Sequence, residues 1–138
     1  MGVVAYWVCT VLVALAMGAG GVVDLLRPPM ALEGLAHLGY PAYFLLIIGA
    51  WKTLSALALL APGFPLLKEW AYAGVVFDLT GAAASHAAVG DPLPNVLIPL
   101  ALTGVTATSW WLRPESRRLP GARLGPAPAA APQSPSQA

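Results

Sequence analysis

The sequence has little charge, and the charge it has is unevenly spread. Only 9% of the 138 residues are charged, whereas 58% are hydrophobic and the mean hydropathy is +0.72. A soluble domain carries about 25% charged residues. Only three basic residues, Arg27, Lys52 and Lys68, lie within residues 1–112. This composition excludes an ordinary soluble globular domain, predominant intrinsic disorder, and nucleic-acid binding through a basic face.

Cysteine is nearly absent as well. Cys9 is the single cysteine. One thiol excludes an intrachain disulfide framework, a thiolate metal cage and a Cys-x-x-Cys dithiol relay. What remains is a small membrane protein.

What the sequence does contain is apolar runs of the length that a bilayer requires. A transmembrane helix needs about 20 mostly apolar residues. Four segments come close to this length, at residues 3–23, 41–61, 70–89 and 95–112. Residues 1–112 are therefore predicted to form an all-α, integral membrane four-helix bundle. No Lys or Arg precedes the first segment, and its apolar run exceeds that of a signal peptide, so we expect it to be retained.

The distribution of charge predicts an orientation. An even number of spans places both termini and the loop between the second and third spans on one side. That side carries five basic residues: Lys68, Arg113, Arg117, Arg118 and Arg123. The opposite side carries Arg27 alone, against Asp24, Glu33 and Asp91. The positive-inside rule therefore predicts cytoplasmic termini, and tryptophans near the same ends agree: Trp7, Trp70, Trp110 and Trp111.

The composition changes abruptly after Leu112. Residues 113–138 contain six prolines among Ala, Ser, Gln and Arg. Such a segment has too little apolar surface to offset the entropy of ordering. We therefore predict that 113–138 is a disordered cytoplasmic tail that does not pack on the bundle.

Two charged residues fall at the middle of predicted spans. Lys52 lies at the middle of 41–61 and Asp78 at the middle of 70–89. These spans are consecutive and antiparallel, so the two side chains reach a similar depth. A lone charge there costs about 2.5–3.5 kcal/mol on insertion scales, so we expect charged atoms within about 4 Å, directly or through one polar group or water. Three interpretations stay open. The pair fixes the register of two helices, it forms the polar floor of a ligand pocket or proton path, or the two side chains do not meet.

A second group of ionisable residues gathers at the outer side. Glu33 and His37 are four residues apart, and so share one face of a short interfacial helix between the first two spans. His86 ends the third span, where it also fits an ordinary interfacial residue. With Asp24 and Asp91 these residues would form a hydrogen-bonded outer cap. Two histidines and a carboxylate can also bind a divalent metal or accept protons beside a quinol. The two histidines do not have His-x-x-x-His spacing, so no metal is predicted.

Two sequence blocks are distinctive in combination. They are His37–Tyr43 (His-Leu-Gly-Tyr-Pro-Ala-Tyr) and Lys68–Gly74 (Lys-Glu-Trp-Ala-Tyr-Ala-Gly). With Glu33, Lys52, Pro62, Ser85, His86, Gly90 and Asp91, they resemble the DoxX-like membrane proteins of bacteria over about residues 5–112. The resemblance implies a four-helix bundle in the bacterial plasma membrane. The wider group includes the small subunit of an archaeal thiosulfate:quinone oxidoreductase and a mycobacterial subunit of a membrane-associated redox complex.

The residues themselves show no redox centre, which argues against an independent redox enzyme. A redox step needs an electron carrier, and apart from Cys9 the sequence has no haem-ligand pair, Cys-x-x-Cys motif or nucleotide loop. We therefore expect an accessory subunit of a quinone- or sulfur-linked membrane redox system. No cofactor is evident in the sequence, so any electrons would come from a bound quinone or from a partner protein. Its expected partners are the lipid bilayer and a redox protein or further copies of itself, and not nucleic acid. The alternative is a small-molecule or proton carrier or sensor that uses Lys52 and Asp78. No pattern identifies a catalytic residue.

Overall fold

Five α-helices make up the fold in the computed structural model, which describes residues 1–120. They are α1 (Gly2–Leu26), α2 (Pro29–His37), α3 (Phe44–Leu60), α4 (Pro65–Ala88) and α5 (Leu93–Trp111), followed by the short 3-10 helix η1 (Glu115–Arg117). No strand occurs within those residues. The all-α prediction is confirmed. Each of the four predicted spans corresponds to one long helix, and α2 is the short segment expected between the first two spans.

The helices begin and end where backbone chemistry requires it. α1 stops at Arg27, whose φ of 53° is left-handed and whose N–H bonds back to the carbonyls of Val23 and Asp24. Pro28 and Pro29 follow, and Pro29 opens α2. α4 starts at Pro65, five residues before the predicted boundary at 70, because a proline is well placed in the first helical turn. α3 starts at Phe44 rather than at residue 41, and residues 42–43 form a turn that precedes it.

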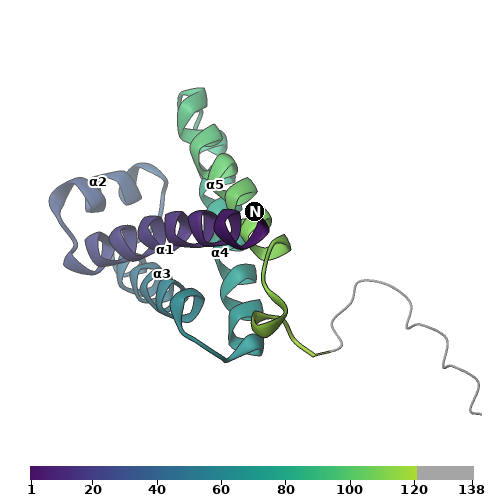
Figure 1. Ribbon diagram of the computed structural model, residues 1–138. Coiled ribbons are helices and arrows are strands. Elements are labelled where there is room, and N and C mark those ends of the chain that lie inside the picture. The colour runs from purple at the N-terminus through teal and green to yellow at the C-terminus, as the bar shows by residue number, and fades with distance from the viewer. Residues whose placement is uncertain (121–138) are drawn as a thin grey trace, which may run out of the picture.

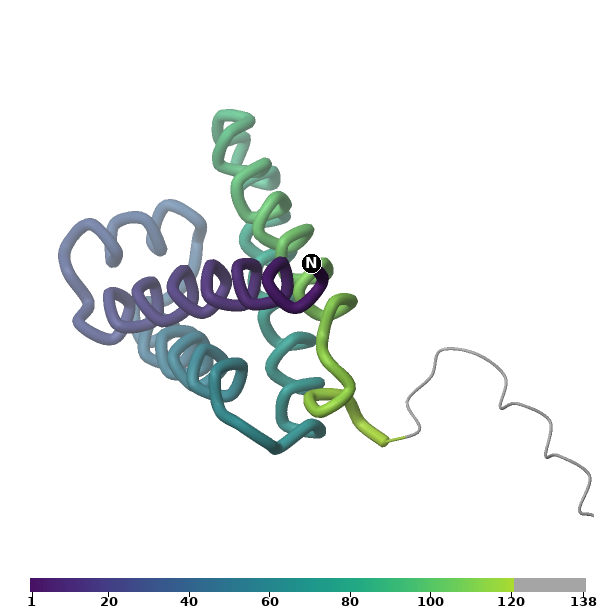
Figure 2. The backbone as a smooth tube through the Cα atoms, viewed as in Figure 1, coloured from purple at the N-terminus to yellow at the C-terminus, as the bar shows by residue number. Residues whose placement is uncertain are grey.

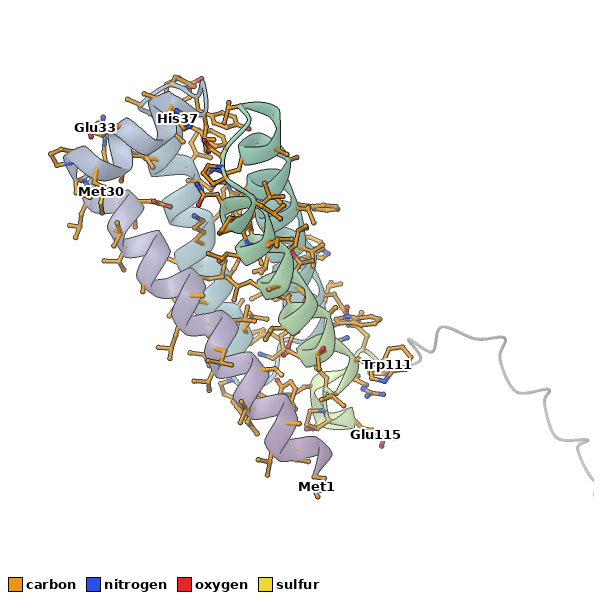
Figure 3. The ribbon with its side chains drawn as sticks, turned by 90° about the horizontal axis from the view of Figure 1, so that it is seen from above. Met1, Met30, Glu33, His37, Trp111 and Glu115 are labelled. Atoms are coloured by element: carbon orange, nitrogen blue, oxygen red, sulfur yellow. The ribbon has the colours of Figure 1, made fainter. Side chains whose placement is uncertain are left out.

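The four long helices associate as two pairs. α1 packs mainly on α3, and α4 packs mainly on α5. In Figure 1 the α1–α3 pair and the α4–α5 pair run across each other, with α2 beyond the far end of α1. Viewed from above, the helices share one long direction (Figure 3), with Met30, Glu33 and His37 at one end and Met1, Trp111 and Glu115 at the other. We call these the α2 end and the termini end.

The buried core is narrow. Ten buried side chains, all apolar except for the Tyr72 hydroxyl, form one cluster between the pairs: Val13, Ala14, Met17, Ala56, Ala58, Leu59, Ala71, Tyr72, Val75 and Leu79. Buried hydroxyls also join three helices, because Ser109 on α5 lies 2.7 Å from both Thr10 on α1 and Tyr72 on α4. Many large apolar side chains point outward instead, including Leu15, Trp51, Phe77 and Trp111. A water-soluble protein rarely exposes so much contiguous apolar surface.

By length and hydropathy, α1 is the one helix within residues 1–120 that could cross a membrane unaided. α3 is comparably apolar but has 17 residues. The helix count and order are thus established, whereas the number of spans stays a prediction.

The predicted start of the tail was wrong. Arg113 is buried, and Arg117 donates hydrogen bonds to the Leu59 carbonyl and the Tyr6 hydroxyl at 3.1 and 3.3 Å. Figure 2 shows this segment passing from the end of α5 beside the N-terminus toward the α3–α4 turn. Arginine side chains supply the contacts that the alanine- and proline-rich composition lacks. The rest of the predicted tail, 121–138, lies outside the described residues.

Candidate functional site

The central charged site contains Lys52 and two carboxylates. The Lys52 ammonium on α3 donates a hydrogen bond to Asp24 Oδ2 on α1 at 3.0 Å. Both side chains are largely buried, with 22% and 15% of their surfaces exposed. This ion pair joins α1 to α3 inside the apolar part of the protein.

Two glycines bring the helices of this pair together. A Cβ atom added to Gly21 would lie 2.8 Å from the Gly49 carbonyl, and one added to Gly49 would lie 2.9 Å from the Gly21 carbonyl. No other residue allows the backbones to approach this closely. An added Cβ atom at Gly49 would also lie 3.0 Å from Asp24 Cβ, so Asp24 lies against this contact, and Lys52 follows Gly49 by one turn of α3. The long Lys52 side chain therefore reaches the Asp24 carboxylate.

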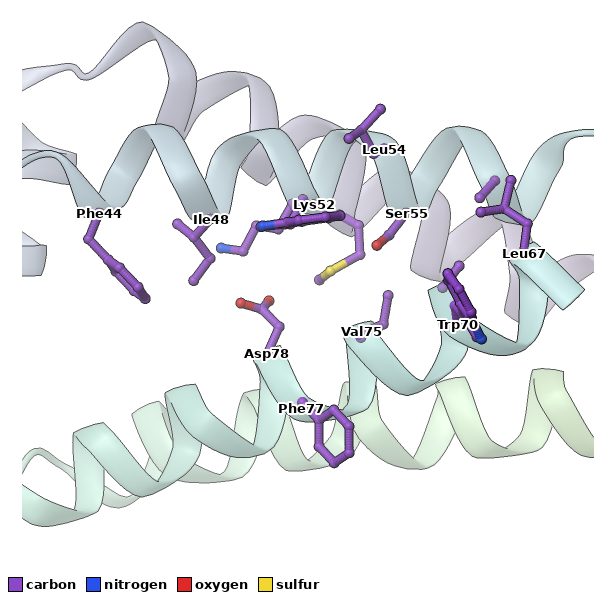
Figure 4. Close-up of a pocket in the computed structure, with 15 residues that line it drawn as sticks. Phe44, Ile48, Lys52, Leu54, Ser55, Leu67, Trp70, Val75, Phe77 and Asp78 are labelled. Carbon is purple, nitrogen blue, oxygen red and sulfur yellow. The ribbon is translucent and has the colours of Figure 1, made fainter.

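The expected direct contact between Lys52 and Asp78 is not formed. No Asp78 oxygen lies within 4.0 Å of the Lys52 nitrogen, whose ionic partner is Asp24 instead. Asp78 projects from α4 toward Lys52 across the space between the helices (Figure 4). The prediction missed Asp24 as the direct partner of Lys52.

A cavity of about 490 Å³ separates α3 from α4 at this level. Its walls are mostly apolar, and its polar groups are Lys52, Asp78 and Ser55. Its rim carries exposed aromatic side chains, Trp51, Trp70 and Phe77. We call this space the lateral cavity, because its rim lies on the outward apolar surface between the two helices.

A second cavity of about 310 Å³ lies on the α2 side of the same charged site. Lys52 and Asp78 line both cavities. The second cavity extends past Asp24 to Tyr40, Ser85 and His86 near the α2 end; we call it the vestibule. Asp78 therefore lies where the two cavities meet.

Near the end of the vestibule, Asp91 joins two histidines. Its two carboxylate oxygens lie 2.6 Å from His37 Nε2 and 2.6 Å from His86 Nδ1. These hydrogen bonds, from His86 first and then His37, hold the pKa of Asp91 below its usual value. Asp91 precedes α5, so the cluster ties the end of α2 to the α4–α5 turn.

Glu33 does not join this histidine cluster. It is exposed on α2 and takes no part in the ion pairs or side-chain hydrogen bonds formed within residues 1–120. Within the same residues, no group of three His, Cys, Asp or Glu side chains has the arrangement of a metal site. Of the five residues expected in the outer cap, the structure thus brings together His37, His86 and Asp91, whereas Asp24 pairs with Lys52 instead.

The termini end holds polar residues that sequence reasoning had counted only as topology signals. Lys68 is fully buried and donates hydrogen bonds to three carbonyls at the end of α3, those of Ala58 (2.7 Å), Leu59 (3.3 Å) and Ala61. The position of Lys68 just after the Pro62–Pro65 turn could have predicted these hydrogen bonds. That turn folds α4 back onto the last carbonyls of α3, which have no partner within their own helix.

A buried arginine fastens α4 to α5 at the same end. Arg113 Nη1 lies 2.7 Å from Glu69 Oε1, and the indole N–H of Trp110 donates to Glu69 Oε2 at 2.9 Å. The Arg113 guanidinium also lies 5.1 Å from the centre of the Tyr72 ring. These contacts are structural, and they leave the two cavities as the candidate site.

Comparison with known proteins matches most of the chain to one family. The sequence model described as the DoxX-like family matches residues 8–109, within the 5–112 expected from the sequence blocks. No curated protein and no solved structure matches the chain.

Proposed function

The chain belongs to the DoxX-like family of membrane proteins, and from that premise we propose that it is a four-span accessory subunit of a quinone- or sulfur-linked redox system. In this proposal α1, α3, α4 and α5 cross the bacterial plasma membrane. A lipid-soluble quinone binds in the lateral cavity. The electrons pass between that quinone and a partner redox protein.

The outward surface supports the membrane embedding. Side chains such as Trp51, Trp70 and Phe77 are 66%, 69% and 75% exposed, as lipid-facing residues would be. The cation balance supports cytoplasmic termini: Lys68, Arg113, Arg117 and Arg118 lie at the termini end, and Arg27 lies at the α2 end. On this orientation the vestibule and the histidine cluster face the outer side.

The lateral cavity is the observation that carries the proposal. Its volume falls within the roughly 300–1,000 Å³ of small-molecule sites, and such sites combine apolar walls with a few polar groups. Lys52 can donate a hydrogen bond to a quinone carbonyl, and Asp78 can accept one from a quinol hydroxyl. The exposed rim admits a ligand from the lipid phase, with its apolar chain left between Trp51 and Trp70.

Tryptophan fluorescence tests this binding. We expect decylubiquinone to quench Trp51 and Trp70 in the purified protein, with quenching reduced in Trp51→Phe and Trp70→Phe. Gly74 lines the cavity, and a Cβ atom added there would have only Ser55 Oγ as a neighbour, at 4.0 Å. The side chain of Gly74→Val can therefore enter the cavity and fill part of it. It should weaken quinone binding about tenfold, the effect of losing roughly 1.4 kcal/mol.

The matched control is Gly104→Val on α5. Gly104 has no neighbour within 4 Å of an added Cβ atom and does not line either cavity. It should leave quinone binding unchanged. Equal quenching in wild type, Gly74→Val and Gly104→Val would reject the lateral cavity as a quinone site.

A carrier or sensor of small molecules or protons is the second candidate. The observation that favours it is that Lys52 and Asp78 line two cavities reaching the charged site from different sides. A carrier should move its substrate across liposomes as a single purified protein, whereas an accessory subunit should require its redox partner. Proton flux in liposomes that disappears in Asp78→Asn would favour the carrier.

A further inference from the structure

Asp78 is a membrane-depth carboxylate that has no direct cationic partner among residues 1–120. It lies 13 residues into α4 and 10 residues from the end of that helix, or about 20 and 15 Å at 1.5 Å per residue. The nearest cation, Lys52, is already paired with Asp24 at 3.0 Å. A carboxylate in this position must either hold a proton or be reached by water.

The vestibule offers the route by which water reaches it. Its polar lining runs from Tyr40, Ser85 and His86 near the α2 end to Asp24, Lys52 and Asp78 at its floor. Its volume of about 310 Å³ would hold several waters, since each needs about 30 Å³. The polar groups at its opening and at its floor supply hydrogen-bond partners for such waters.

We propose that the vestibule is a cation-preferring aqueous entry through which Asp78 exchanges protons with the outer side. Hydronium at the floor gives a proton to the Asp78 carboxylate and leaves water, and the reverse step returns the proton. This inference rests on the proposed membrane embedding, but it does not require a quinone.

The charges around the vestibule give it this preference. Asp24 and Lys52, from α1 and α3, cancel each other, which leaves the charge of ionised Asp78 on α4 uncompensated. At the opening, Asp91 is shared by His37 from α2 and His86 from α4. An excess of carboxylates in a narrow space favours cations over anions.

The proposal can be tested by the accessibility of two cysteine variants on α4. Ala82 lines the vestibule, whereas Ala84, two residues along α4, is exposed on the apolar outside. Each is changed to cysteine in a Cys9→Ala background, so that the new thiol is the single one. Right-side-out and inverted vesicles are then treated with two impermeant methanethiosulfonates, the trimethylammonium reagent MTSET and the sulfonate reagent MTSES.

We expect Ala82→Cys to react from the outer side at least about tenfold faster than Ala84→Cys. Relative to free cysteine, MTSET should react with Ala82→Cys about tenfold faster than MTSES does, because of the net charge. That ratio should rise with pH as Asp78 loses its proton. With Asp78→Asn added, the rise should disappear.

Several outcomes would overturn the proposal. Equal, slow labelling of both cysteines from both sides would show that no aqueous vestibule exists. An unchanged pH dependence in Asp78→Asn would show that Asp78 is not the exchanging carboxylate. Labelling of Ala82→Cys from the cytoplasmic side alone would support the vestibule and overturn its outer orientation. None of these results depends on quinone quenching, so failure of the quinone proposal is distinguishable.

Discussion

Removing the carboxylate of Asp24 should destabilise the protein much more than removing that of Asp78. Asp24→Asn leaves the Lys52 ammonium without the partner that it now contacts at 3.0 Å. Asp78→Asn removes a carboxylate that makes no direct ion pair. The two substitutions are chemically identical, so each serves as the matched control of the other.

The distance and burial give the expected size. At 3.0 Å and an effective dielectric constant near 20, Coulomb attraction is about 5.5 kcal/mol before any desolvation cost is subtracted. Removing one partner from a buried pair costs about 3–5 kcal/mol. Because Asp78 remains nearby for Lys52 to approach, we expect about 2–3 kcal/mol for Asp24→Asn and below about 1 kcal/mol for Asp78→Asn.

The assay is unfolding by SDS titration in mixed micelles, followed by circular dichroism, on two double-mutant cycles. Lys52→Met is combined with Asp24→Asn in one cycle and with Asp78→Asn in the other. We expect a coupling energy of about 2 kcal/mol in the first cycle and below about 0.5 kcal/mol in the second. Equal coupling in the two cycles would refute the assignment of Asp24 as the partner of Lys52.

Three further predictions concern the two ends of the bundle. Lys68→Met should lower the free energy of unfolding by about 2–4 kcal/mol in the same titration, because it removes the donor to three carbonyls of α3; a loss below about 0.5 kcal/mol would contradict this reading. Since hydrogen bonding lowers the pKa of Asp91, its contribution to stability is full above the ordinary aspartate value near 3.8 and is lost as pH falls through the lowered value. Asp91→Asn should therefore flatten the acid limb of a stability-versus-pH curve, and Glu33→Gln should not; the same curve for both variants would count against the cluster. Deleting 121–138 should leave the melting temperature nearly unchanged, whereas deleting 113–138 should lower it by several degrees, because only the longer deletion removes the buried arginine contacts; equal losses would show that these contacts contribute nothing.

The sequence predicts the helices well because their signals are local. Apolar length gives the four long helices, and prolines give most of their ends. The Glu33–His37 spacing correctly predicts the short helix α2. The meeting of His37, His86 and Asp91 was also predicted, because all three lie at one end of consecutive elements.

The ionic partner of Lys52 was harder to predict, because it depends on a contact between α1 and α3, which are not consecutive helices. Lys52 and Asp78 were paired because their segments are consecutive. The stronger signal was glycine: Gly21 and Gly49 bring α1 against α3, and Asp24 lies against that contact. Asp24 was assigned to the outer loop, since a charge was expected to end the span, whereas α1 continues to Leu26.

The two cations at the end of α3 become available at very different times during synthesis. Lys68 follows Leu59 by nine residues, but Arg117, which binds the same carbonyl, follows it by 58. At roughly 5–20 residues per second, the ribosome needs about 3–12 s to make the 58 residues from Leu59 to Arg117. The first cation reaches its acceptor as soon as the α3–α4 turn emerges, whereas the second arrives only after α5 is complete. A nascent chain stalled after Trp111 but before Arg117 would carry all five helices and still lack the contact by which Arg117 joins α3 to Tyr6 near the N-terminus.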